Sequence, residues 1–109
     1  MELPVINHKD YFAKIGDDHK FPIKKFGELA NYLIKKKIVK KFYKPYLCSD
    51  ETLKRAHSEQ YIKNVKNKTL DKETIRRIGF PIVDSVVQRS LVATGGTVLA
   101  SKLAIKNGI

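Results

Sequence analysis

Few residues in this sequence have the types and spacing that catalysis or metal binding requires. The histidines are His8, His19 and His57, and none of them pairs with another at the i, i+4 spacing of a helical metal site. A catalytic zinc needs three protein ligands and an open position for water. The stretch Asp17-Asp18-His19 could hold a metal, but adjacent carboxylates in a polar loop are usually solvated. We therefore predict no catalytic residue and no metal ligand in these 109 residues.

The other reactive side chains are interpreted as structural. Cys48 has no neighbouring histidine to activate its thiol, so we expect a buried or unreactive cysteine. His57 lies between two expected helices and is interpreted as a capping or packing residue rather than an acid or base. A single cysteine, no signal peptide and no long apolar run together predict a cytoplasmic protein that does not interact with a membrane.

The charge of the chain raises a different function. The net charge is +11, and 18 of the 22 basic residues are lysines. Residues 35–44, which we call the lysine segment, interleave Phe42 and Tyr43 with lysines and could follow a nucleic-acid backbone without reading its sequence. Because phosphate recognition favours arginine, we prefer a structural interpretation, in which these lysines line a helix end and an edge strand. The lysines of this candidate basic patch are Lys35, Lys36, Lys37, Lys40, Lys41 and Lys44.

Apolar periodicity predicts the helices that must position these groups. A helical stripe begins near residue 23 and reaches residue 35. Two short helices are expected at about 51–56 and 59–67, with Asp50 and Ser58 as N-caps, and a third short helix should end at Gly79. The strongest pattern predicts a helix of about 24 residues that begins near Val83 and stops at Asn107-Gly108.

The apolar segment 3–8 suits a short buried strand or an extended arm, and residues 40–44 are predicted to be a second strand. The order of strand, helix, strand and several helices favours an α/β fold with about two parallel strands. A long apolar helix needs a larger sheet than two strands provide, and in a β-α-β unit a further strand would follow it. We therefore expect residues 1–109 to be an incomplete segment of one domain.

Gly95 and Gly96 interrupt the long predicted helix. Each glycine in a helix costs roughly 0.5 to 1 kcal/mol relative to alanine, so a compensating contact is expected. Neither a Walker motif nor a dinucleotide fingerprint is present around the pair. The glycines therefore predict the close approach of another backbone.

Three stretches resemble the opening segment of the histone deacetylase family, in its bacterial and class IV-like branch. They are HKFPIKKFGELANYL (19–33), AHSEQYI (56–62) and RRIGFPIVDSVVQRSLVATGGTVLASKLAIKNGI (76–109). The resemblance implies an arginase-like three-layer α/β/α fold and zinc-dependent hydrolysis of acetyl-lysine or similar amides. It also implies that the family's paired-histidine motif and its zinc ligands lie beyond the matched segment, so this chain alone would hold no zinc and be inactive.

The resemblance offers one candidate site residue and one partner. In the family, basic residues that follow a proline line an internal channel. Lys24 is the best match to them in this sequence, although the family more often has arginine there. The partner would be the missing C-terminal part of the deacetylase domain. Two alternatives remain open: a small basic module that binds nucleic acid, and an interaction protein that docks a partner through its last helix.

Overall fold

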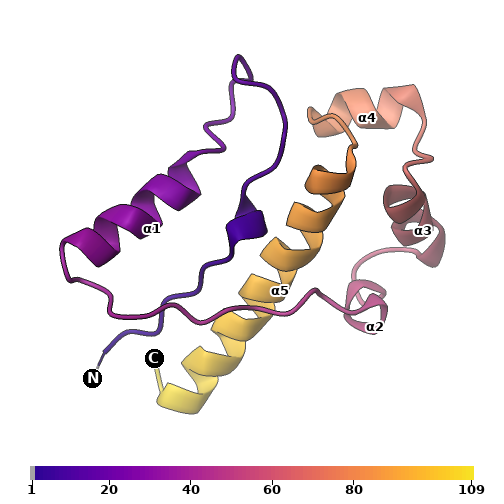
Figure 1. The fold of residues 1–109 in the computed structure, drawn as a ribbon. Helices are drawn as coiled ribbons and strands as arrows, with labels where there is room; N and C mark the ends of the chain where they lie inside the picture. Colours follow the sequence, from indigo (N-terminus) through magenta and orange to yellow (C-terminus); the bar gives the residue numbers. More distant parts are fainter. Residues whose placement is uncertain (1) are drawn as a thin grey trace.

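The structure, a computed structural model, describes residues 2–109 and is built mainly from helices. The long helix α5 (Asp84–Asn107) runs through the middle of the molecule (Figure 1). The helix α1 (Lys25–Lys35) lies on one side of it, and the helices α2 (Asp50–Leu53), α3 (Glu59–Asn67) and α4 (Lys72–Ile78) lie on the other. A single 3₁₀ turn, η1 (Lys9–Tyr11), packs against both α5 and α1.

The helix boundaries largely follow the sequence signals. Ser58 caps α3 by accepting a hydrogen bond from the N–H of Tyr61, as predicted. Gly79 and Gly108 end α4 and α5 with φ of 81° and 68°, in the left-handed region that favours glycine. One cap prediction was wrong: Ser49, not Asp50, caps α2, because its hydroxyl accepts from the N–H of Thr52.

The predicted α/β fold is wrong, because residues 2–109 contain no sheet. The two segments predicted as strands do lie side by side, but they share only one parallel bridge, between Ile6 and Tyr43. The N–H of Tyr43 donates to the carbonyl of Val5 at 2.8 Å, and the N–H of Asn7 donates to the carbonyl of Tyr43 at 3.1 Å. Pro45 has no N–H with which to continue this ladder. The arginase-like three-layer arrangement is therefore corrected to a helical one.

The packed interior is small. One apolar cluster joins Ala13, Ile15 and Ile23 to aromatic side chains from the loop before α1, from α1 itself and from the loop before α5. Outside this cluster few residues are buried, and those on α5 are Val92, which is 1% exposed, and the pair Gly95 and Gly96. Within the described chain, no helix combines the length and the apolar character that a membrane crossing requires.

The molecule is open for its length. Its radius of gyration is 15.7 Å, whereas a compact domain of this size has about 13 Å. Its accessible surface is 8271 Å², against about 6,200 Å² for a monomeric globular protein of the same mass. Residues 2–109 therefore expose about a third more surface than a self-contained domain does.

Candidate functional site

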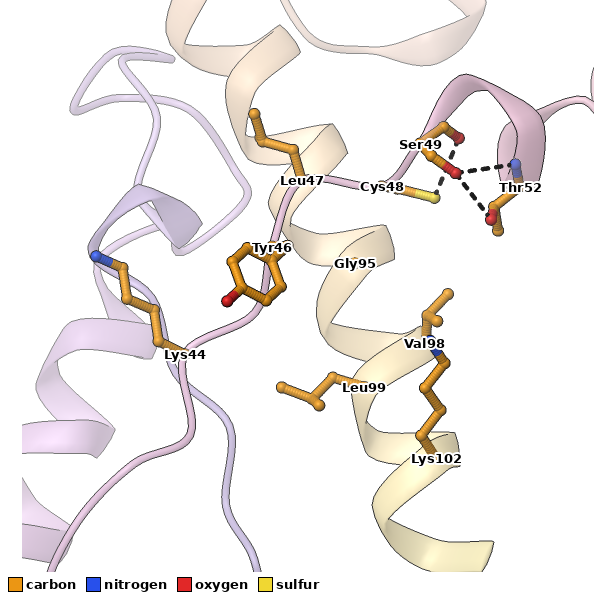
Figure 2. Close-up of a pocket in the computed structure, with 10 residues that line it drawn as sticks. All are labelled: Lys44, Tyr46, Leu47, Cys48, Ser49, Thr52, Gly95, Val98, Leu99 and Lys102. Carbon is orange, nitrogen blue, oxygen red and sulfur yellow. Dashed lines mark hydrogen bonds between the residues drawn. The ribbon is translucent and has the colours of Figure 1, made fainter.

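The glycine pair of α5 marks the closest packing in the structure. Residues 44–49 cross α5 in an extended conformation at Gly95 (Figure 2). A Cβ atom at position 95 would overlap the carbonyl oxygen of Tyr46 and lie 3.1 Å from its carbonyl carbon. With no side chain there, the N–H of Cys48 can donate to the carbonyl of Leu91 at 3.1 Å. The prediction that another backbone approaches the glycine pair is confirmed.

Gly96 serves a second contact, with η1. A Cβ atom at position 96 would overlap the hydroxyl oxygen of Tyr11. Burial raises the pKa of the Tyr11 phenol above its ordinary value, and the positive charge of Arg89 opposes that shift. The Nε of Arg89 donates to the carbonyl of Tyr11 at 2.8 Å, and Gln88 donates to Asp10 at 3.1 Å. Two adjacent glycines thus let α5 contact two different chain segments.

Arg89 also packs against aromatic rings. Its guanidinium carbon lies 5.5 Å from the ring centre of Phe21 and 5.1 Å from that of Phe26, within the range of a cation–π contact. Sequence reasoning gave Arg89 no role. The sequence feature that could have indicated a role is its position in α5. Arg89 lies one turn before Val92, among residues that face inward.

A cavity of about 220 Å³ lies beside the crossing of residues 44–49 over α5. The hydroxyl of Ser49 donates to that of Thr52 at 3.0 Å, so both hydroxyls serve the start of α2. The Cys48 thiol is buried and contacts the carbonyl of Ser49 at 3.8 Å. No histidine, aspartate or glutamate is among its lining residues, so the commonest general bases are missing beside the Cys48 thiol and the Ser49 hydroxyl. Its lining residues are Lys44, Tyr46, Leu47, Cys48, Ser49, Thr52, Gly95, Val98, Leu99 and Lys102.

The histidines have structural partners. His19 accepts a hydrogen bond from the N–H of Phe21 through Nδ1, so its Nε2 carries the proton and donates to the carbonyl of Gly79 at 2.9 Å. Its ring also stacks on Phe80, with 5.1 Å between ring centres. His8 accepts from the N–H of Asp10 at 2.9 Å. The His57 ring lies 5.3 Å from the ring of Tyr61.

The residues of this chain do not fit a zinc site. Across residues 2–109, no three histidine, cysteine, aspartate or glutamate side chains come close enough to hold a metal ion. At the Asp17-Asp18-His19 stretch, both ring nitrogens of His19 are engaged, and Asp17 faces Lys24 at 3.7 Å. No step of a metal-dependent reaction is therefore assigned to these side chains.

The remaining predicted residues are on the surface. Lys24, the candidate channel residue, precedes α1 and is exposed. The six lysines of the lysine segment are exposed as well, and in residues 2–109 none of them forms an ion pair with a carboxylate. Lys36 and Lys41 instead lie 5.9 Å and 5.3 Å from the ring centres of Tyr32 and Tyr43.

Comparisons with known proteins show a relative of this chain but no family. No family model matches the chain. An uncharacterized protein of Picosynechococcus sp. (strain ATCC 27264 / PCC 7002 / PR-6) is 36% identical over 111 residues, which cover 100% of this chain and 37% of the relative. The chain thus spans little more than a third of the length of the curated relative it matches. The description of that relative gives no activity, so the deacetylase interpretation rests on the sequence resemblance alone.

Proposed function

We propose that this chain is the N-terminal segment of a larger hydrolase of the deacetylase type. Its role there is to support catalytic residues that lie outside residues 1–109. The resemblance supplies the reaction class, which is hydrolysis of the amide of an acetylated lysine or a similar group. The relative from Picosynechococcus supports the larger size, because it extends well beyond the matched 111 residues.

The observation that carries this proposal is the excess accessible surface. Its 8271 Å² exceeds the surface of a monomeric domain of this mass by about 2,100 Å². Large permanent interfaces bury about 2,000 to 5,000 Å² counted over both partners, or about 1,000 to 2,500 Å² on each, so an excess of this size on one chain lies within their range. Such an area would be covered if these helices pack against the remainder of a larger protein.

Two helices carry part of the uncovered apolar surface. On α1, Leu29 is 57% exposed, Tyr32 is exposed one turn further along, and Ile34 is exposed near the helix end, although all three belong to the helix that packs Phe26 and Ala30 inward. On α5, Ile105 in the last turn is 83% exposed. Soluble domains rarely leave apolar side chains clustered on a helix face unless a partner covers them.

The chain's own residues would then act by positioning. The crossing at Gly95 fixes residues 44–48 against α5, and Arg89 ties η1 to the same helix. These contacts hold separate parts of the chain against one helix. A cytoplasmic location is part of the proposal, since the single cysteine, Cys48, remains a free thiol.

Acetate release tests the proposal. The protein is produced with the residues that follow this segment in its gene, or with the product of the adjacent gene, and is incubated with an acetyl-lysine peptide. We expect acetate release that a chelator abolishes and added zinc restores. Gly95→Val should remove this activity by displacing residues 44–48, whereas Gly27→Ala, where an added Cβ meets open space, should retain it.

Two outcomes would count against it. A folded, zinc-loaded protein that releases no acetate would exclude the reaction class. A stable complex with an unrelated protein, formed through α1 or the end of α5, would instead favour an interaction subunit. Sedimentation velocity on the same samples separates these outcomes, because it reports assembly independently of activity.

A further inference from the structure

We propose that the lysine segment and the groove beside it bind single-stranded nucleic acid, independently of any hydrolase activity. The first support is uncompensated charge. Residues 35–44 contain six lysines and no acidic residue, and none of these lysines pairs with a carboxylate in the described chain. In contrast, Lys66 and Lys68 at the end of α3 form ion pairs with Asp50 of α2 and Asp84 of α5.

The end of α1 does not need these lysines as caps. The carbonyl of Tyr32 accepts from the N–H of Lys36, and that of Ile34 accepts from the N–H of Lys37. The carbonyl of Leu33 accepts from the N–H groups of Ile38 and Val39. Backbone groups thus satisfy the last turn, and the lysine side chains remain available to an external anion.

An apolar groove of about 140 Å³ adjoins the same lysines. Leu3 is 69% exposed and Ile38 is 59% exposed at this groove, so its walls offer apolar surface to a ligand. Lys40, Lys41 and Tyr43 also line it, and the acidic Glu2 lies at the same groove, so the two lysines outnumber the carboxylate there. A nucleobase can lie on the apolar wall beside the tyrosine ring while the lysines meet the neighbouring phosphates.

The chemistry favours a single strand read without sequence preference. All four arginines lie outside the lysine segment, so the bidentate contact that distinguishes bases is missing there. Lysines that bind an anionic membrane usually occupy one face of an amphipathic helix. The lysine segment leaves helix α1 after Lys35, and Tyr43 pairs with an extended segment, so it has no such face.

Fluorescence anisotropy of the purified protein with a labelled oligouridylate tests the proposal. Two variants carry the same change in net charge. The first replaces Lys36, Lys37, Lys40 and Lys41 with glutamine and alters the lysine segment. The second replaces with glutamine Lys14, Lys20, Lys72 and Lys106, which are exposed lysines elsewhere that form no ion pair within residues 2–109. We expect the first variant to bind at least about tenfold more weakly than the second at low salt.

Salt dependence and stacking give independent measurements. Each phosphate contact on a single strand contributes roughly 0.7 to the slope of log K against log salt, so the first variant should lower that slope by about 3. Tyr43→Leu should weaken binding about fivefold or more, since stacking on one base contributes roughly 1 to 3 kcal/mol. Circular dichroism confirms that each variant is folded.

Three results would overturn the proposal. The first is that the protein fails to bind oligouridylate at low salt. The second is that the two four-lysine variants lose the same amount of affinity, which would indicate binding through diffuse charge. The third is that the protein binds phosphatidylserine vesicles but no oligonucleotide. None of these results bears on acetate release, so the hydrolase proposal is tested separately.

Discussion

The carbonyl of Tyr46 lies against α5 at Gly95, in the space that a Cβ atom would occupy. The side chain of Tyr46 is meanwhile 91% exposed, so the contact is made by the backbone alone. The N–H of Cys48, two residues later, is bound to α5 through the carbonyl of Leu91. A buried glycine therefore fixes the path of residues 44–48, whatever the side chain at position 46.

Gly95→Ala should destabilise the protein by about 2 to 4 kcal/mol, because the added methyl group meets backbone atoms that cannot rotate away. Gly27→Ala is the matched control. It is also a glycine in a helix, but an added Cβ meets nothing within 4 Å, so we expect it to stabilise by about 0.5 kcal/mol. Urea unfolding measures both. Equal effects at the two positions would show that only helix propensity matters.

Gly96→Ala should be partly rescued by Tyr11→Phe. The added Cβ overlaps the tyrosine hydroxyl, and with that oxygen removed the nearest ring atom, Cζ, lies 3.3 Å away. A double-mutant cycle should therefore give a coupling free energy of about 1 kcal/mol or more in favour of the double variant. Strict additivity would mean that the Tyr11 side chain moves away from Gly96 without cost.

The sequence predicted the helices well, because their signals are local. The apolar period of 3.6 residues placed α1 and α5, and the hydroxyl of Ser58 and the φ of Gly79 act within one turn of the chain. Ser49 and Asp50 show the limit of such signals. Both can cap a helix, and only the conformation decides which one does.

The strands and the site were harder, because they depend on distant residues. The segments around Ile6 and Tyr43 pair at a single position, and pairing alone cannot make a sheet without further neighbours. Arg89 and Tyr11 are 78 residues apart in sequence, and no local pattern links them. The sequence predicted that a backbone segment would pack closely against the glycine pair, since a helix tolerates paired glycines for close packing. It did not predict that Tyr46 would be the residue in contact with Gly95.

Stability should fall at high pH through Tyr11. Its pKa is raised in the folded state, chiefly by burial, so the folded protein holds this proton more tightly than the unfolded chain. This tighter proton binding contributes its full stabilisation below the ordinary tyrosine pKa of about 10. The stabilisation is lost as the pH rises through the pKa that Tyr11 has in the folded state. Unfolding free energies measured from about pH 9 to 11 should therefore fall less steeply in Tyr11→Phe than in the original protein. Parallel curves would contradict this.

Arg89→Lys should cost about 1 to 2 kcal/mol. The lysine loses the Nε hydrogen bond to the carbonyl of Tyr11 and the flat contact with Phe21 and Phe26. Arg76→Lys on the exposed surface of α4 is the control, and we expect a change within about 0.5 kcal/mol. Thermal unfolding of the two variants distinguishes a structural arginine from one that only adds charge.

Ile105 gives the sharpest test of the larger protein. Its side chain is 83% exposed here, and serine has a similar helix propensity, so Ile105→Ser should change the stability of residues 1–109 by less than about 0.5 kcal/mol. If the rest of the protein covers the end of α5, the same change should cost about 2 kcal/mol or more in the complete protein, because a buried isoleucine is then lost. Val92→Ala, at a position that is 1% exposed, should cost about 2 kcal/mol in both. An Ile105→Ser variant that is neutral in both would leave the end of α5 solvent-exposed in the complete protein and would remove the packing argument for the proposed function.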